Sequence, residues 1–264
     1  MIKLIDDIFY QTGVINMSRP LIWAHRGASG HAPENTLSAF DLAAKMGADG
    51  VELDIQLTKD GAIVVCHDEK IDRTSNGAGF VRDYTLAELK KFNFCNGNLF
   101  YEDATIPTME EVFNLLDPTG LTINIELKTG VFFYPGIEEK IVDLTHKKNW
   151  QDRVIYSSFN HYSIMKIKEI DPDAKLGFLY ADGSLDMPLY GHQQGVDALH
   201  PALYNLQYPH FMEDCRKHGL DVNVWTVNST ADIKRCIELG VNAIITNYPD
   251  KANSLLSYRE SEEA

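Results

Sequence analysis

The sequence lacks the features that would indicate a membrane, secreted or disulfide-bonded protein. No apolar run approaches the roughly 20 residues that a membrane-spanning helix needs. The first twenty residues have no basic start and no small-residue cleavage site, and Asp6 and Asp7 interrupt their apolar pattern, so we expect no signal peptide. The four cysteines form no CxxC pair, which favours free thiols in a reducing compartment and argues against a zinc site. We therefore expect a cytoplasmic protein.

Basic residues are also scarce. The chain has 24 Lys and Arg against 38 Asp and Glu, a formal net charge of −14 over 264 residues. Such a surface repels polyanions, so we expect no nucleic-acid partner and no stable membrane association. A small-molecule ligand fits better, and an anionic one would need a metal or clustered cations in its site. The sequence leaves open whether the chain is a monomer or a homodimer.

What the sequence does contain is a regular alternation of short apolar runs and amphipathic helical patterns. The runs predict strands at Leu21–Ala24, Gly50–Gln56, Thr122–Leu127, Val154–Ser158, Leu176–Tyr180, Val196–Leu199, Val222–Val227 and Ala243–Thr246. Several of the intervening helical patterns end in glycine, the usual C-terminal stop. Eight strands interleaved with helices predict an α/β protein with a TIM (β/α)₈ barrel. A doubly wound open sheet is the alternative, although no GxGxxG turn supports dinucleotide binding.

The predicted barrel spans residues 21–257 and has two flanking segments. Residues 1–20 form an N-terminal extension that reads as a short helix, and residues 258–264 form an acidic tail that we expect to be flexible. Residues 57–107 interrupt the alternation as a small insertion after the second strand. Connections in α/β units are usually about 2–6 residues, and much longer ones are often functional. We expect this insertion at the catalytic end of the barrel.

Acidic residues mark the second and third predicted strands. In VELDIQL, Glu52 and Asp54 are two residues apart, so both side chains project to one face of the strand. In NIELK, Glu126 and Lys128 repeat this spacing on the next strand. Three carboxylates at one rim suit a single Mg²⁺ or Ca²⁺ ion better than zinc. The alternative is a salt bridge from Lys128, which would leave a third acid unpaired.

Two histidines lie where they can serve this acidic cluster. His25 ends the first strand, and His67 ends the strand-like run AIVVCHDEK in the insertion. Imidazoles titrate near neutrality, so the pair is suited to general acid and base catalysis. The other seven histidines fall mostly on predicted helices or loops and are interpreted as structural or exposed. Among them His200, at the end of the sixth strand, stays a weak candidate.

Further side chains at the strand ends suit a phosphate group and its substituents. The guanidinium of Arg26 offers a fork of donors that matches phosphate oxygens. Glu34 precedes a helix and reads as part of its cap, with orientation of Arg26 or a histidine as an equally weighted second role. The aromatic residues Trp225 and Phe159 are core or pocket walls.

These segments resemble, in order and over nearly the whole chain beyond residue 20, the glycerophosphodiester phosphodiesterase family. The segments that carry the resemblance are AHRGASGHAPENT at 24–36, GVELDIQLTKDGAIVVCHD at 50–68, DRTSNGAGFVRDYTLAELK at 72–90, IPTMEEV at 106–112, NIELK at 124–128 and VNVWTVN at 222–228. The resemblance implies a TIM barrel with an insertion after the second strand and one divalent cation.

The resemblance also implies roles for individual residues. Metal ligands match Glu52, Asp54 and Glu126; acid/base histidines match His25 and His67; phosphate contacts match Arg26 and Lys128. The implied reaction is hydrolysis of glycerophosphodiesters to sn-glycerol 3-phosphate and an alcohol, with His25 assigned as base and His67 as acid.

Two alternative functions remain at this stage. One is phospholipase D-like cleavage of lysophospholipids on the same barrel, which would need an apolar entrance. The other is a non-catalytic barrel that binds glycerophosphodiesters, although such a protein would be expected to lose a histidine or a carboxylate. A comparison of glycerophosphocholine with lysophosphatidylcholine addresses the first, and binding without product formation in the presence of metal addresses the second.

Overall fold

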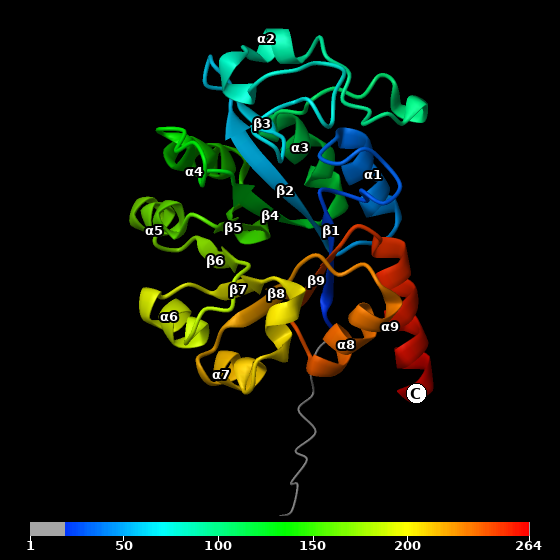
Figure 1. The fold of residues 1–264 in the computed structure, drawn as a ribbon, viewed down its shortest axis with the longest axis vertical. Coiled ribbons are helices and arrows are strands. Elements are labelled where there is room, and N and C mark those ends of the chain that lie inside the picture. Colours follow the sequence, from blue (N-terminus) through cyan, green and yellow to red (C-terminus); the bar gives the residue numbers. More distant parts are fainter. Residues whose placement is uncertain (1–18, 264) are drawn as a thin grey trace, which may run out of the picture.

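The computed structural model describes residues 19–263, and within them eight parallel strands close into a barrel (Figure 1). β9 pairs with β1, and β1 pairs with β2, so the ring has no free edge. This closure excludes the open doubly wound sheet and confirms the TIM barrel. The barrel strands are β1 Leu21–His25, β2 Gly50–Leu57, β4 Thr122–Leu127, β5 Val154–Ser158, β6 Lys175–Tyr180, β7 Ala198–Pro201, β8 Asp221–Val224 and β9 Ala243–Thr246.

The strands separate apolar from polar side chains by their two-residue period. Every residue of β2 is buried, yet Val51, Leu53 and Ile55 join the apolar core between strands and helices, whereas Glu52 and Asp54 alternate with them. The two carboxylates therefore face the barrel interior, as the spacing predicts.

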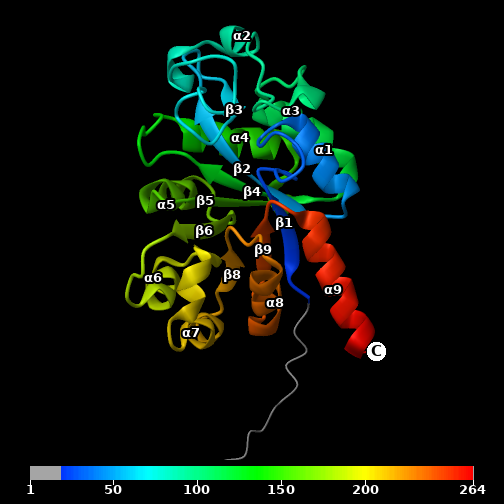
Figure 2. The same cartoon turned by 45° about the vertical axis from the view of Figure 1, so that its right-hand side comes forward.

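A shell of helices surrounds the barrel, as Figures 1 and 2 show from two directions. Side-chain hydroxyls cap three of these helices at their N-termini, namely Thr36, Thr108 and Ser229. Gly240 ends α8 in the left-handed conformation. The helices are α1 Leu37–Lys45, α3 Met109–Leu116, α4 Ile137–Lys148, α5 His161–Ile170, α6 Met187–Gln194, α7 Phe211–Lys217, α8 Thr230–Leu239 and α9 Pro249–Glu263.

The predicted insertion is a small lobe after β2, at the top of Figure 1. Its strand β3 (Ile63–Val65) pairs antiparallel with β2, and α2 (Leu86–Leu89) follows between two 3₁₀ turns. The lobe has a separate apolar cluster that includes Ile71 and Val81. Pairing of β3 with β2 and the packing of this cluster therefore fix the position of the lobe. In this position the segment after β3 lies beside the C-terminal ends of the barrel strands.

The boundaries differ most from the sequence predictions in three places. The seventh barrel strand, expected at Val222–Val227, is β8 at Asp221–Val224, because beyond Val224 the chain keeps only an isolated bridge from Trp225 to Ala202. The sixth barrel strand, expected at Val196–Leu199, is β7 at Ala198–Pro201, because Gly195 ends α6 and the chain needs two residues to turn into the sheet. α9 runs to Glu263, so most of the expected tail at 258–264 continues a helix whose earlier turns bury Ala252 and Leu256.

The extension expected as a helix at residues 1–20 lies almost entirely outside the described residues. No helix within residues 19–263 has the length and apolarity to cross a bilayer. The cytoplasmic location and the oligomeric state remain predictions from the sequence.

Candidate functional site

Three carboxylates converge at the C-terminal end of the barrel, as the sequence predicts. Glu52 and Asp54 lie on β2, and Glu126 lies opposite Asp54 in the register of β4. Each offers an oxygen within 4.8 Å of the other two, and all three side chains are buried. Neighbouring parallel strands thus bring residues 72 positions apart into one cluster.

Burial and neighbouring charges shift the pKa values of the three carboxylates. Burial raises the pKa of Glu52 well above its usual value, and the charges of Asp54 and Glu126 raise it further. Burial likewise raises the pKa of Glu126. Burial alone would also raise the pKa of Asp54, but the nearby charge of Arg26 holds it below its usual range. Like-charged groups at this spacing favour a cation between them.

The donor set fits a hard divalent cation. Oxygen ligands without thiolate or imidazole are the preference of Mg²⁺ and Ca²⁺. Asp54 Oδ1 is fully buried and accepts no hydrogen bond within residues 19–263, and the ammonium of Lys128 lies 3.9 Å from it. Such an orphaned acceptor is costly unless an ion binds it. Glu52, Asp54 and Glu126 are therefore the residues that would hold the metal.

Lys128 pairs with two of the three acids, which tests the salt-bridge alternative. Its ammonium donates to Glu126 Oε1 at 2.9 Å and lies 3.9 Å from Asp54 Oδ1. Glu52 has no side-chain ammonium or guanidinium partner among the ion pairs of the described chain; it accepts from the backbone N–H of Arg26 at 3.0 Å. The salt bridge exists, but it does not neutralise the whole cluster.

His25 ends β1 beside the acids. Its Nδ1 lies 2.7 Å from Oδ1 of Asn247, which accepts the Nδ1–H bond and leaves Nε2 with a free lone pair. Nε2 is 3.9 Å from Glu52 Oε2. Burial, helped by the charge of Arg26, lowers the pKa of His25 to about 4. The ring is therefore neutral at pH 7 and can accept a proton.

His67 reaches the same pocket from the insertion. Its Nδ1 lies 2.6 Å from Asp68 Oδ1, so the carboxylate orients the ring and leaves Nε2 to face other groups. Arg73 donates to Asp68 and brings the pKa of this carboxyl down to about 2. The two predicted histidines thus line one pocket from separate segments of the chain.

Arg26 lies in the turn after β1 with a positive φ of 56°. Its Nη1 donates to Glu34 Oε1 at 2.8 Å, and its Nε is 3.5 Å from Asp54 Oδ2. The second role weighed for Glu34, orientation of Arg26, is the one that the structure shows, while Thr36 caps α1. The side chain of Asn35 donates to Asp54 Oδ2 at 2.8 Å.

The two predicted aromatic residues form one wall of the pocket. Phe159 and Trp225 contact edge to face, with ring centroids 5.5 Å apart, and Phe159 is 44% exposed. Trp225 Nε1 donates to the carbonyl of His200 at 2.8 Å. The pocket has a volume of about 70 Å³, and His25, Arg26, Glu52, His67 and Glu126 line it too.

Asn247 and Arg73 are not among the residues predicted from the sequence, and His200 is only a weak catalytic candidate there. Asn247 follows β9, and its position just after a barrel strand is the signal that would have identified it. Arg73 lies in a Gly- and Asn-rich loop and has no strand-end signal. His200 is fully buried inside the barrel, beside the amides of Asn124 and Asn223, and burial lowers its pKa to about 3.

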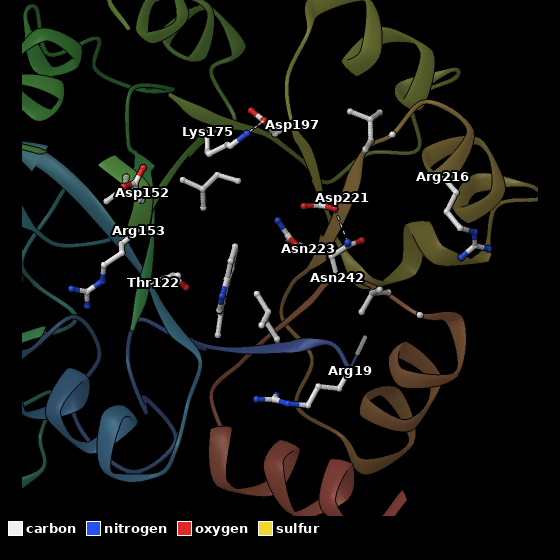
Figure 3. Close-up of a pocket in the computed structure, with 18 residues that line it drawn as sticks. Arg19, Thr122, Asp152, Arg153, Lys175, Asp197, Arg216, Asp221, Asn223 and Asn242 are labelled. Atoms are coloured by element: carbon white, nitrogen blue, oxygen red, sulfur yellow. Dashed lines mark hydrogen bonds and ion pairs between the residues drawn. The ribbon is translucent and has the colours of Figure 1, made fainter. Parts of the chain in front are cut away.

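A larger cavity of about 920 Å³ lies at the opposite end of the barrel (Figure 3). Its lining includes the first residues of several strands. Among its charged groups, Lys175 pairs with Asp197 at 2.8 Å, and Asp221 accepts from the amide of Asn242 at 2.6 Å. No metal-binding acid cluster other than that of β2 and β4 occurs in the described chain. Cavity size alone therefore does not locate the site.

Comparison with known proteins gives a consistent result. A profile described as the glycerophosphoryl diester phosphodiesterase family matches residues 25–251. A glycerophosphodiester phosphodiesterase of Caldanaerobacter subterraneus is 44% identical over 241 residues, covering 90% of this chain and 98% of that protein. One of Bacillus altitudinis is 40% identical over 236 residues, covering 88% and 96%.

Solved structures agree with these sequence matches. An Oleispira antarctica phosphodiesterase in complex with the product sn-glycerol-3-phosphate superposes with a TM-score of 0.81 at 28% identity. The match covers 90% of this chain and 97% of that one.

Proposed function

The chain belongs to the glycerophosphoryl diester phosphodiesterase family, and from this premise we propose that it hydrolyses glycerophosphodiesters to sn-glycerol 3-phosphate and an alcohol. The observation that carries the proposal is a cluster of three buried carboxylates, two of which, Glu52 and Glu126, line one pocket together with two oriented histidines. The product bound to the Oleispira relative supports glycerol phosphate as the recognised part.

We assign the divalent cation, Mg²⁺ or Ca²⁺, to Glu52, Asp54 and Glu126. When bound, such an ion neutralises phosphate oxygens as negative charge develops on them in the transition state. The buried acids would supply its ligands, and the ammonium of Lys128 limits their mutual repulsion. Arg26 and Lys128 are then the fixed cations that bind the phosphate group beside this cluster.

The two histidines divide the proton transfers. His25 is neutral near pH 7, and Asn247 holds its Nδ1–H, so Nε2 acts as the base that removes a proton from the attacking hydroxyl. His67 is the acid that protonates the departing alcohol oxygen, with Asp68 stabilising the charged ring. Phe159 and Trp225 contact the carbon skeleton of the substrate.

The experiment that tests this proposal is release of glycerol 3-phosphate from glycerophosphocholine, glycerophosphoethanolamine and glycerophosphoglycerol. Each substrate is assayed after EDTA treatment and again with Mg²⁺ or Ca²⁺ added. We expect inactivation by EDTA and recovery with at least one ion, and the comparison selects the ion and the head group. Substrate binding without product release under any ion would support the non-catalytic barrel instead.

One observation favours a second candidate, the phospholipase D-like cleavage of lysophospholipids. Large apolar side chains that are at least 43% exposed occur in the four successive segments that follow β4, β5, β6 and β7, and one of them, Phe159, lines the pocket. Exposed apolar groups on successive segments at one end of a barrel indicate a binding surface. They are Val131 and Phe133 after β4, Phe159 and Tyr162 after β5, Leu185 after β6, and Tyr204 and Tyr208 after β7.

Lysophosphatidylcholine, compared with glycerophosphocholine at concentrations below its aggregation limit, distinguishes the two candidates. A higher kcat/KM for the lysolipid, lost on substitution of Phe133 and Leu185 by Ser, would establish an apolar chain as part of the preferred substrate. A higher value for glycerophosphocholine would assign these side chains no role in substrate choice.

A further inference from the structure

Arg73 contacts two segments that carry proposed site residues: the turn after β1, which carries Arg26, and the segment after β3, which carries His67. Its Nη1 and Nη2 donate to the two oxygens of Glu34 at 2.6 and 2.8 Å. Its Nε and Nη2 donate to the two oxygens of Asp68 at 2.7 and 3.0 Å. A guanidinium has five N–H donors in a fixed plane, so this double bidentate arrangement sets the two carboxylates at a defined separation.

Each of these carboxylates also contacts a residue that lines the pocket. Glu34 Oε1 also accepts from Arg26 Nη1 at 2.8 Å, and Asp68 Oδ1 also lies 2.6 Å from His67 Nδ1. His67 belongs to the insertion, whereas Arg26 belongs to the turn after β1. One side chain, Arg73, therefore joins the proposed phosphate-binding group to the proposed acid through two carboxylates.

The charges of this network reinforce its geometry. Hydrogen bonds from Arg73 lower the pKa of Asp68 to about 2, and those from Arg73 and Arg26 lower the pKa of Glu34 although burial opposes them. Both carboxylates are thus ionised and act only as acceptors. Asp68 then requires the Nδ1–H tautomer of His67, which leaves Nε2 as the atom that exchanges a proton with substrate.

We infer that Arg73 is a positioning residue: through Glu34 and Asp68 it fixes the position of His67, in the insertion, relative to Arg26, in the barrel. The inference rests on the proposed function. It differs from a purely structural role, in which Arg73 only attaches the insertion. An ordinary ion pair with a half-exposed partner contributes little to stability, and the Arg73 side chain is 45% exposed. A structural role alone therefore predicts a small effect on turnover.

The chain offers a matched control for this distinction. Lys90, also in the insertion, donates to both oxygens of Glu111 on α3 at 2.7 and 2.9 Å. This ion pair also links the insertion to the barrel, but neither residue lines the pocket. R73Q and K90Q each remove an ion pair between the insertion and the barrel. Only R73Q also removes the hydrogen bonds that connect His67 with Arg26.

The test measures kcat and KM of both variants and of R73K with two substrates. One is glycerophosphocholine, a poor leaving group, and the other is the p-nitrophenyl ester of glycerol 3-phosphate, a good one. A general acid contributes about 10²–10⁴-fold to turnover, and its misplacement should remove part of this. We expect R73Q to lower kcat for glycerophosphocholine about 10–100-fold, clearly more than for the nitrophenyl ester, and to raise KM for both.

We expect R73K to lie between wild type and R73Q, since an ammonium keeps the charge but not the double fork, and K90Q to match wild type. Equal losses for both leaving groups in R73Q, or wild-type kinetics in R73Q, would overturn the inference. If R73Q does not fold, R73K decides by the same leaving-group comparison. A wild-type protein that cleaves neither substrate with any ion would instead overturn the proposed function.

Discussion

The two ends of the barrel carry similar residue types and use them differently. At the N-terminal end, around a cavity of about 920 Å³, Lys175 pairs with Asp197 and Asp221 accepts from the amide of Asn242 (Figure 3). At the C-terminal end, a pocket of about 70 Å³ holds buried acids that their neighbours neutralise only in part. The difference teaches that a cluster of buried acids that are neutralised only in part marks the site, and that the volume of a cavity does not.

The cause lies in the topology. Strand starts follow helices that end near the surface, so charged groups there reach solvent and each other. Strand ends lead into the loops, and here β2 and β4 bring Glu52, Asp54 and Glu126 inside the barrel before those loops begin. Burial of like charges is unfavourable for stability and is retained where a ligand requires it.

Exchange of one acid at each end is expected to separate the two ends most widely, because it changes both turnover and metal binding. E126Q removes a proposed metal ligand and keeps the shape of the side chain, so we expect turnover of glycerophosphocholine to fall at least about 100-fold, comparable to the loss of a transition-state donor. D221N makes the same change at the other end and should leave turnover near wild type. Calorimetric titration with Mg²⁺ or Ca²⁺ should show weakened binding only in E126Q. Full activity in E126Q would refute the metal assignment.

Removal of a histidine at each end sharpens the comparison further. His67 and His146 each lie within 2.7 Å of a carboxylate, Asp68 and Asp171, but His146 is on α4, away from the pocket. H67A should lower kcat about 10²–10⁴-fold for glycerophosphocholine and less for a nitrophenyl ester, because only the poor leaving group needs an acid. H146A should change neither rate. Equal losses across leaving groups in H67A would exclude the acid role.

Most of the fold was predictable because its signals are local. Three of the eight barrel strands begin and end at the predicted residues, as at Thr122–Leu127, since an apolar run bounded by turns leaves little freedom. α6 was harder, because Gly191 argues against a helix interior, and the tertiary packing of Met187 and Gly191 overrides this preference, while Pro188 lies in the first turn, where proline is tolerated.

The site was predictable where it rests on strand periodicity and not where it rests on long-range contact. Glu52 and Asp54 share a face by spacing alone, and the strand-end positions of His25 and Glu126 follow from the barrel. The bond between His25 and Asn247 joins residues 222 positions apart, and the links of Arg73 cross two separate loops. Such contacts depend on how loops fold back, which no local pattern encodes.

The smallest effect is expected from His200, which lies between the two ends. It is completely buried. Its ring nitrogens lie 3.4 Å from the amide of Asn124, which lines the C-terminal pocket, and 3.0 Å from the amide of Asn223, which lines the N-terminal cavity. Burial lowers its pKa from 6.5 to about 3 in the folded protein. The unfolded chain therefore binds one more proton than the folded chain between these values, and stability falls as the pH drops through this window.

H200Q cannot take up that proton, so its stability should depend less on pH. Urea unfolding at pH 6, 5 and 4.5 should show a free energy of unfolding that falls more steeply in wild type than in H200Q, by about 1.4 kcal/mol per pH unit. Turnover of the folded variant should stay near wild type, since no atom of the His200 side chain lines either cavity. An equal pH dependence of the unfolding free energy in wild type and H200Q would mean that His200 is protonated in the folded barrel. The amides of Asn124 and Asn223 would then surround a charged ring instead of a neutral one.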